Sequence, residues 1–133
     1  MAIDTSIAKF NDEQQIVFGW AYVSHMPDGT QVFDFSGDFI EDPGVIEKAA
    51  YQYVMDSRSG DVMHNGKVVA TLVESMVFTP DKVEKMGLPE GTCPTGWWIG
   101  MKVLDRTVWA DVKKGRWKAF SIGGTGVRVD VED

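Results

Sequence analysis

The chain has 133 residues, which suits one domain that is large enough to bury a hydrophobic core without disulfides or metals. Its formal net charge of −7 at pH 7 disfavours nucleic acid as a partner, and its one cysteine excludes an intrachain disulfide. No apolar run approaches the roughly 20 residues that span a bilayer, and residues 1–11 do not resemble a secretory signal, so we expect a soluble intracellular protein.

The first half of the chain predicts a β-hairpin followed by a helix. Residues 16–24 are β-branched and aromatic, and residues 31–40 alternate apolar and polar side chains, as strands do. A Met-Pro-Asp-Gly turn separates these two segments. Asp42 followed by Pro43 is typical of a helix start, and apolar residues recur at helical spacing from there to about residue 57.

The second half predicts further strands with two helices between them. Residues 61–64 are a short strand or a loop, and the clearest strand signals come later, at residues 67–78, 97–104, 117–122 and 127–131. Thr79 caps a short helix that ends at Gly87, and Asp105 caps a helix that runs through Lys114. Residues 88–96 contain two prolines and two glycines, which predicts a loop.

Together these segments amount to six or seven strands with two or three helices. Strands dominate, and their alternation is that of an antiparallel sheet covered on one side. We therefore expect an α+β fold with an antiparallel, barrel-like core that is closed or nearly closed and is surrounded by the helices.

Few residues in this chain could bind a metal or a phosphate. His25, His64 and Cys93 do not have the spacing of zinc ligands. The Gly-Gly-Thr-Gly sequence at residues 123–126 does not begin a helix, and no phosphate-binding loop motif is present. We expect no cofactor and no metal, which leaves acid–base or nucleophilic chemistry by side chains alone.

His64 and Ser121 are the candidate base and nucleophile. His64 lies at the edge of a strand-like segment, and an imidazole is the natural general base at neutral pH. Ser121 stands between Phe120 and Ile122 near a strand end, and the glycines after it allow the close backbone approach that an oxyanion hole requires. Taken singly, the two residues are more typical of a turn histidine and a strand serine.

A carboxylate is the candidate third member of such a site. Glu74 has the same strand parity as the apolar residues around it, so it would interrupt an apolar face, and a buried carboxylate needs a partner such as a histidine N–H. A bulged strand or a solvated face would explain Glu74 equally well. Asp61 and Asp38 are the alternatives for the same role.

The remaining reactive residues predict less. His25 lies in a turn sequence and is interpreted as exposed and structural. Cys93 follows a threonine and precedes a proline in the predicted loop, with no histidine adjacent in sequence, so it is a weak candidate nucleophile. The five tryptophans are more typical of packing than of a ligand cage.

Seven short segments occur in an order that resembles a known family. They are Phe18-Gly19-Trp20-Ala21-Tyr22-Val23, the helical Ile46, Glu47, Ala49 and Ala50, Met63-His64, Val73-Glu74-Ser75, Gly96-Trp97-Trp98-Ile99-Gly100, the set Val108, Trp109, Val112, Lys113 and Gly115, and Phe120-Ser121-Ile122-Gly123-Gly124. Spanning residues 16–131, this pattern resembles the XkdF-like phage serine proteases, relatives of the prohead maturation proteases, which are in turn similar to the herpesvirus assemblins.

The resemblance implies that residues 1–133 form a single prohead-protease-like catalytic domain. It implies a serine endopeptidase that cleaves phage scaffold and major capsid proteins, and also itself, during prohead maturation. Carried over by motif, the nucleophile falls on Ser121, the base on His64 and an acidic third member on Glu74. Assemblins use a second histidine after the serine, and this chain has no histidine beyond His64, so the third role is open.

The resemblance also implies where the protein acts and what it meets. It places the chain inside an assembling prohead in the host cytoplasm, or in a bacterium that carries the prophage, and it implies self-association, with neither nucleic acid nor membrane as a partner. Phage proteases of this kind often carry a C-terminal extension, so the sequence given is compatible with a catalytic core, with a trimmed product and with a family member that has no extension.

Three other interpretations compete with the protease. A non-catalytic homologue with the same barrel would bind scaffold or build structure, and would tolerate loss of Ser121 and His64. A small ligand-binding domain would use its tryptophans and the loop at residues 88–96 as a pocket. An enzyme based on Cys93 would be inactivated by iodoacetamide and indifferent to Ser121.

Overall fold

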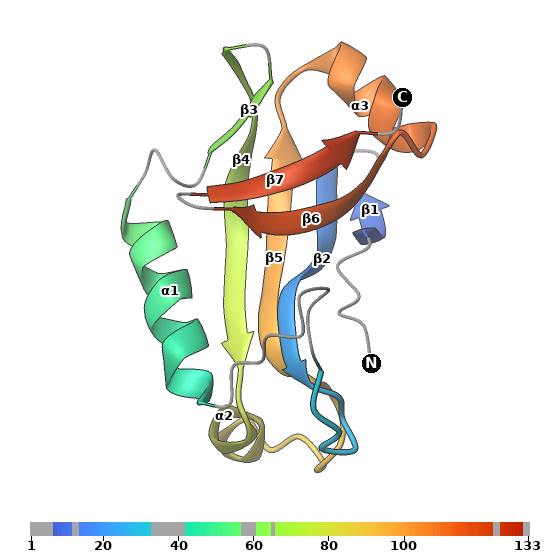
Figure 1. The fold of residues 1–133 in the computed structure, drawn as a ribbon. Coiled ribbons are helices and arrows are strands. Elements are labelled where there is room, and N and C mark those ends of the chain that lie inside the picture. The colour runs from blue at the N-terminus through green and yellow to red at the C-terminus, as the bar shows by residue number, and fades with distance from the viewer. Residues whose placement is uncertain are drawn as a thin grey trace.

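A computed structural model describes the backbone of residues 7–11, 14–32, 42–56, 61–64, 66–123 and 126–131, and the side chains of residues 14–32, 42–56 and 66–116. In chain order the elements are β1 (Ile7–Asn11), β2 (Ile16–His25), α1 (Pro43–Met55), β3 (Asp61–His64), β4 (Lys67–Phe78), α2 (Pro80–Lys85), β5 (Thr95–Val103), α3 (Arg106–Lys113), β6 (Trp117–Gly123) and β7 (Gly126–Val131) (Figure 1).

The strands form an open sheet and a separate hairpin. The sheet is antiparallel with the order β1-β2-β5-β4-β3, and the three long strands β2, β5 and β4 make its centre. β6 and β7 pair only with each other among the described strands. The predicted six- or seven-stranded barrel is therefore wrong, although the class, a small α+β fold, is retained. Alternation of side chains is identical in open and closed sheets, so it cannot predict whether the outer strands pair.

β2 has strand neighbours that the sequence did not indicate, and the predicted hairpin with residues 31–40 is described only at its start. β2 pairs with β5 along its length and with β1 at its beginning. Gln31 forms an isolated bridge with His25, and Val32 N–H donates to Ser24 O, but the predicted strand beyond Val32 lies outside the described residues. β1 was missed because its five residues are too short to show a clear alternation.

The helix caps are confirmed. The Asp42 carboxylate accepts from Gly44 N at 2.8 Å at the start of α1, and Thr79 Oγ1 accepts from Lys82 N at 3.3 Å at the start of α2. Asp105 Oδ1 accepts from the N–H groups of Thr107 and Val108 at the start of α3. These bonds satisfy donors that have no partner within the helix, which is why they could be predicted locally.

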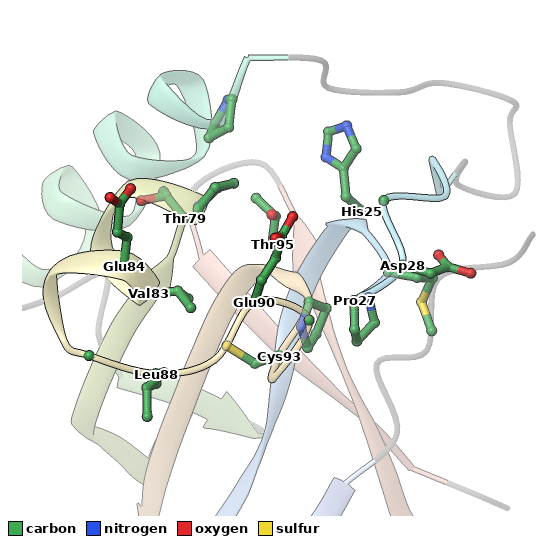
Figure 2. A pocket seen from close by; sticks show the side chains of 17 residues that line it. His25, Pro27, Asp28, Thr79, Val83, Glu84, Leu88, Glu90, Cys93 and Thr95 are labelled. Atoms are coloured by element: carbon green, nitrogen blue, oxygen red, sulfur yellow. The ribbon is translucent and has the colours of Figure 1, made fainter.

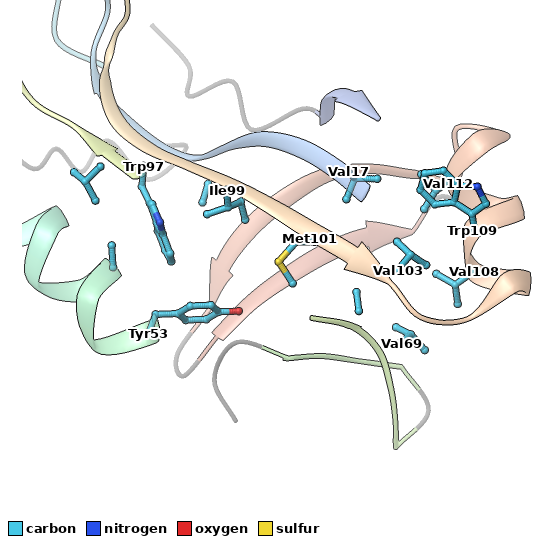
Figure 3. Close-up of a cluster of buried hydrophobic side chains, with 14 of the residues drawn as sticks. Val17, Tyr53, Val69, Trp97, Ile99, Met101, Val103, Val108, Trp109 and Val112 are labelled. Carbon is cyan, nitrogen blue, oxygen red and sulfur yellow. The ribbon is translucent and has the colours of Figure 1, made fainter. Parts of the chain in front are cut away.

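One face of the sheet carries the core. Trp97, Ile99, Met101 and Val103 alternate along β5 toward this face, and Ile99 and Met101 are 0% exposed (Figure 3). The ring of Tyr53 on α1 packs edge-on against the ring of Trp97, with 5.3 Å between the two ring centroids. At the other end of β5 the core continues into Val108, Trp109 and Val112 of α3. This is the core face.

The core face is covered by α1, by α3 and by the hairpin. α1 contacts β4 and β5, β6 contacts β2 and β1, and β7 contacts β3. Figures 1 and 3 show the β6-β7 hairpin crossing the sheet on the side toward which Met101 points. The middle of β5 is therefore buried between two β layers.

The opposite face, called the outer face, carries a row of partly exposed aromatic rings. The ring centroid of Trp20 lies 5.1 Å from that of Trp98 and 5.8 Å from that of Phe78. The rings of Phe18 and Trp98 are stacked, with their centroids 6.4 Å apart. Glu74 shares this face, because a Cβ built on its strand partner Gly100 would meet both the Phe18 ring and the Glu74 Cβ. The sheet thus separates Glu74 from the hairpin.

Candidate active site

Ser121 lies on β6, in the hairpin that covers the core face. It pairs with Arg128 of β7, and two residues later Gly123 pairs with Gly126 at the end of the ladder. Glycines beside a strand end permit close approach of another backbone. The hairpin that was predicted around Ser121 is confirmed, with bounds that differ by one residue from those expected.

His64 is the last residue of β3, the strand that β7 of the hairpin contacts. It pairs with Lys67, the first residue of β4, across a tight connection. Because β7 contacts both β3 and β6, the strand that carries His64 and the strand that carries Ser121 share a neighbour. The described side chains include neither residue, so the hydrogen bond between them stays a prediction.

Glu74 is not brought to His64. The strand partner of His64 is Lys67, seven positions before Glu74 on β4, which at about 3.3 Å per residue separates the two by roughly 20 Å. The Glu74 side chain is also exposed on the outer face. A bulge between Leu72 and Glu74 shifts the register, so that Glu74, Met76 and Phe78 lie on the outer face although Leu72 pairs with the core residue Met101, and the parity argument from sequence did not hold through this strand.

The other acidic candidates lie elsewhere. Asp61 is the first residue of β3 and pairs with Thr71, whereas Asp38 lies outside the described residues. Asp105, which the sequence indicated only as a helix cap, forms a salt bridge with Lys67, the strand partner of His64. Lys67 Nζ lies 3.1 Å from Asp105 Oδ2. Its bond from the Val108 N–H, and then that from Lys67, lower the pKa of the Asp105 carboxyl. This proximity depends on strand order, so no sequence signal indicated it.

Cys93 does not have the surroundings of an activated nucleophile. It is half-buried in the loop before β5, and burial raises the pKa of its thiol. A reactive cysteine needs the opposite shift, which a neighbouring cation or a helix N-terminus supplies. The interpretation of the chain as a cysteine enzyme is therefore disfavoured.

The described side chains contain a serine–histidine contact that is structural. Ser24 Oγ lies 2.9 Å from His25 Nδ1 and donates to the Thr95 carbonyl oxygen at 3.3 Å. Ser24 is 0% exposed, so no substrate carbonyl can reach its oxygen. The pair ties the end of β2 to the start of β5.

A cavity of about 850 Å³ lies at one end of the sheet, between the turn after β2, α2 and the loop before β5 (Figure 2). We call it the end cavity. Its described lining includes His25, Asp28, Glu84, Glu90 and Cys93 but no tryptophan. The loop at residues 88–96 thus helps to form a pocket, as the ligand-binding interpretation expected, whereas Trp97 and Trp109 belong to the core.

Two kinds of site are absent from the described part of the chain. No group of three histidine, cysteine, aspartate or glutamate side chains there could hold a metal ion. No described helix combines the length and apolarity that crossing a bilayer requires.

Comparison with known proteins gives a family and two relatives. Residues 4–130 match the family described as "Putative phage serine protease XkdF". Two proteins of Bacillus subtilis (strain 168) are similar: "Uncharacterized protein YqbD", 33% identical over 128 residues, and "Phage-like element PBSX protein XkdF", 29% identical over 114 residues. No solved structure matches the chain.

The matches cover most of this chain but a smaller part of each relative. The alignments cover 96% and 86% of this chain but 36% and 38% of the two relatives, so the chain spans little more than a third of their length. The family match, in contrast, includes nearly every residue of the chain, with both His64 and Ser121 inside it. The chain therefore belongs to the XkdF family, whose description is "Putative phage serine protease XkdF", as the resemblance predicted.

Proposed function

We propose that this chain is a serine endopeptidase domain with Ser121 as nucleophile and His64 as general base. The observation that carries the proposal is the family match over residues 4–130, which includes both residues at the strand positions described above. The geometry of the β6-β7 hairpin supports the proposal in two ways. Ser121 lies two residues before Gly123, which pairs with Gly126 at the end of the hairpin ladder. In addition, β7 of the same hairpin contacts β3, the strand that carries His64.

The proposed reaction is acyl transfer. The Ser121 Oγ attacks a peptide carbonyl carbon while the His64 imidazole accepts the hydroxyl proton, and the imidazolium then donates that proton to the leaving amine. Water next attacks the acyl-enzyme ester with the same histidine as base, which releases the acid and restores the serine. N–H groups beside Gly123 are the proposed donors to the oxyanion.

The proposed substrates are phage scaffold and major capsid proteins, and the chain itself, during prohead maturation. Family membership supports a phage setting, and the net charge of −7 suits a protease that acts before DNA enters the same shell, since it would bind DNA weakly. In this proposal the protein works inside the assembling prohead in the host cytoplasm and associates with itself there.

The proposal is tested by active-site labelling with a fluorophosphonate, measured as intact mass. We expect one adduct on the wild type and none on Ser121→Ala or His64→Ala, because a fluorophosphonate reacts rapidly only with a serine that a neighbouring base activates. Ser75→Ala and His25→Ala are the matched controls and should label like the wild type, with circular dichroism confirming the fold of every variant. An adduct that survives Ser121→Ala would contradict the proposal.

The third role is tested in the same assay. Glu74→Gln should label at close to the wild-type rate, because the register keeps Glu74 roughly 20 Å from the strand partner of His64. Asp61→Asn and Asp105→Asn are compared with it, and the acid that orients His64 is the one whose loss slows labelling and shifts its pH profile. A slow Glu74→Gln variant would return that residue to the triad.

The separation of Glu74 from His64 favours one second candidate function. A domain that lost its acidic partner could persist as a non-catalytic module that binds scaffold. That candidate predicts a well-folded wild type with no adduct, and assembly that is unaffected by Ser121→Ala.

A further inference from the structure

The described side chains that line the end cavity carry an excess of negative charge. Three carboxylates, Asp28, Glu84 and Glu90, line it, and no lysine or arginine does among its described lining residues. Glu84 and Glu90 form no ion pair with a described cation. Hydrogen bonds from Thr30 lower the pKa of the Asp28 carboxyl and so favour its charged form.

The lysines of α2, which could have balanced this charge, are held elsewhere. Lys82 Nζ lies 2.9 Å from Glu47 Oε2 on α1, and Lys85 Nζ lies 3.1 Å from Asp81 Oδ2. Neither lysine lines the cavity. The end cavity therefore keeps a net acidic lining that favours a cationic ligand.

The walls of the end cavity suit a side chain that is apolar along its length. Four prolines, Pro27, Pro43, Pro80 and Pro94, line it together with Val83 and Leu88, and Val83 is buried. The two glutamates are exposed. Figure 2 shows Glu84 on the side of α2 and Glu90 beside Thr95. Arginine and lysine bury a methylene stem against apolar walls while their charged ends stay at a polar margin.

We propose that the end cavity binds a peptide segment of a partner protein that presents an arginine or lysine side chain, with the stem against the proline walls and the cation at Glu84 and Glu90. The volume of about 850 Å³ lies within the range of about 300–1,000 Å³ that is usual for ligand sites. It exceeds what one side chain fills, so neighbouring residues of the segment bind there as well.

This site is distinct from the proposed active site. The end cavity adjoins Thr79 and Pro80 after the last residue of β4, whereas His64 pairs with the first. With 12 residues in β4, the two ends lie roughly 35 Å apart. The cavity thus recruits a protein without forming the pocket beside the scissile bond, and the proposal does not depend on catalysis.

The test uses Cys93, the one cysteine of the chain, as a reporter inside the cavity. The rate of its alkylation by iodoacetamide is measured at mildly alkaline pH in the Ser121→Ala background, where no peptide is hydrolysed. The probes are two capped pentapeptides with a central arginine or a central citrulline between leucines. We expect saturable protection by the arginine peptide and much weaker protection by the citrulline peptide, which has the same shape but no charge.

Variants then locate the effect. Glu84→Gln combined with Glu90→Gln should weaken protection by about three- to tenfold, since exposed charge contacts of this kind are individually modest. Glu74→Gln removes an exposed carboxylate outside the cavity, on the outer face, and should leave affinity unchanged. Equal protection by both peptides, full affinity of the double variant, or equal protection by spermidine would each overturn the proposal. Because catalysis is absent from every arm, none of these results bears on the fluorophosphonate experiment.

Discussion

Gly96 lies against a neighbouring backbone that leaves no room for a side chain. A Cβ built there would lie 2.9 Å from the Val23 Cα and closer still to the Tyr22 carbonyl oxygen, so β2 and β5 could not keep their spacing. The same strand contains Gly100, whose Cβ would meet mainly the Phe18 ring at 3.0 Å. An aromatic ring turns more easily than a paired strand moves.

We therefore expect Gly96→Ala to be the more damaging of two similar substitutions. Gly96→Ala should lower the free energy of unfolding by about 2–4 kcal/mol, because a backbone shift must open the β2-β5 ladder. Gly100→Ala, the control in the same strand, should cost clearly less. Urea unfolding followed by tryptophan fluorescence measures both, and a smaller effect at Gly96 than at Gly100 would contradict this account.

Among the elements, α1 and α2 are joined by a polar network at their exposed sides. Lys82 Nζ donates to the Tyr51 hydroxyl at 2.8 Å and lies 2.9 Å from Glu47 Oε2, and the Tyr51 hydroxyl donates to that carboxylate at 2.7 Å. The bond from Tyr51, and then that from Lys82, lower the pKa of the Glu47 carboxyl. Lys82 also donates to the Val77 carbonyl oxygen of β4, so the network anchors both helices to the sheet.

This network predicts a pH-dependent contribution from Glu47. A carboxyl whose pKa is lowered by folding stabilises the fold above its ordinary titration range, and that stability is lost as the pH falls through its folded pKa. Glu47→Gln should thus cost about 0.5–1 kcal/mol at neutral pH and nothing in acid. Thermal unfolding across pH measures the difference, with Asp81→Asn as the exposed control. A Glu47→Gln cost that grows in acid would have the wrong sign.

At the scale of the whole molecule, the two faces of the sheet serve different purposes. The core face is sealed by α1, α3 and the β6-β7 hairpin, whereas the outer face stays partly open around its aromatic row. The end cavity and the strand pair of His64 lie at opposite ends of β4. The proposed recruiting site and the proposed catalytic site therefore lie on different surfaces of the fold.

Neighbouring residues on β5 test this division between the faces. Met101→Ala should lower the free energy of unfolding by about 2–5 kcal/mol, because Met101 is fully buried between the sheet and the hairpin. Lys102→Ala, one position later on the exposed outer face, should change it by less than about 0.5 kcal/mol. Chemical unfolding measures both, and similar costs at the two positions would show that the hairpin does not cover the core face.

Part of the candidate site could be predicted from sequence and part could not. The hairpin around Ser121 and the short strand that ends in His64 follow from local alternation and turn residues, and both are present in the structure. The role of Glu74 was inferred from parity along β4, which one bulge reverses. The salt bridge of Asp105 with Lys67 joins residues 38 positions apart, and nothing local indicates it.

The sequence by itself determined the helices, their caps and most of the described strands, because caps, turns and strand propensity depend on hydrogen bonds and backbone angles within a few residues. It also determined the family, because the family match spans residues 4–130. Only the tertiary structure decided that the sheet is open, that Glu74 lies away from His64 and that an acidic cavity forms at one end. These features depend on which strands pair and in which register, and the period of two along a strand is the same for every such arrangement.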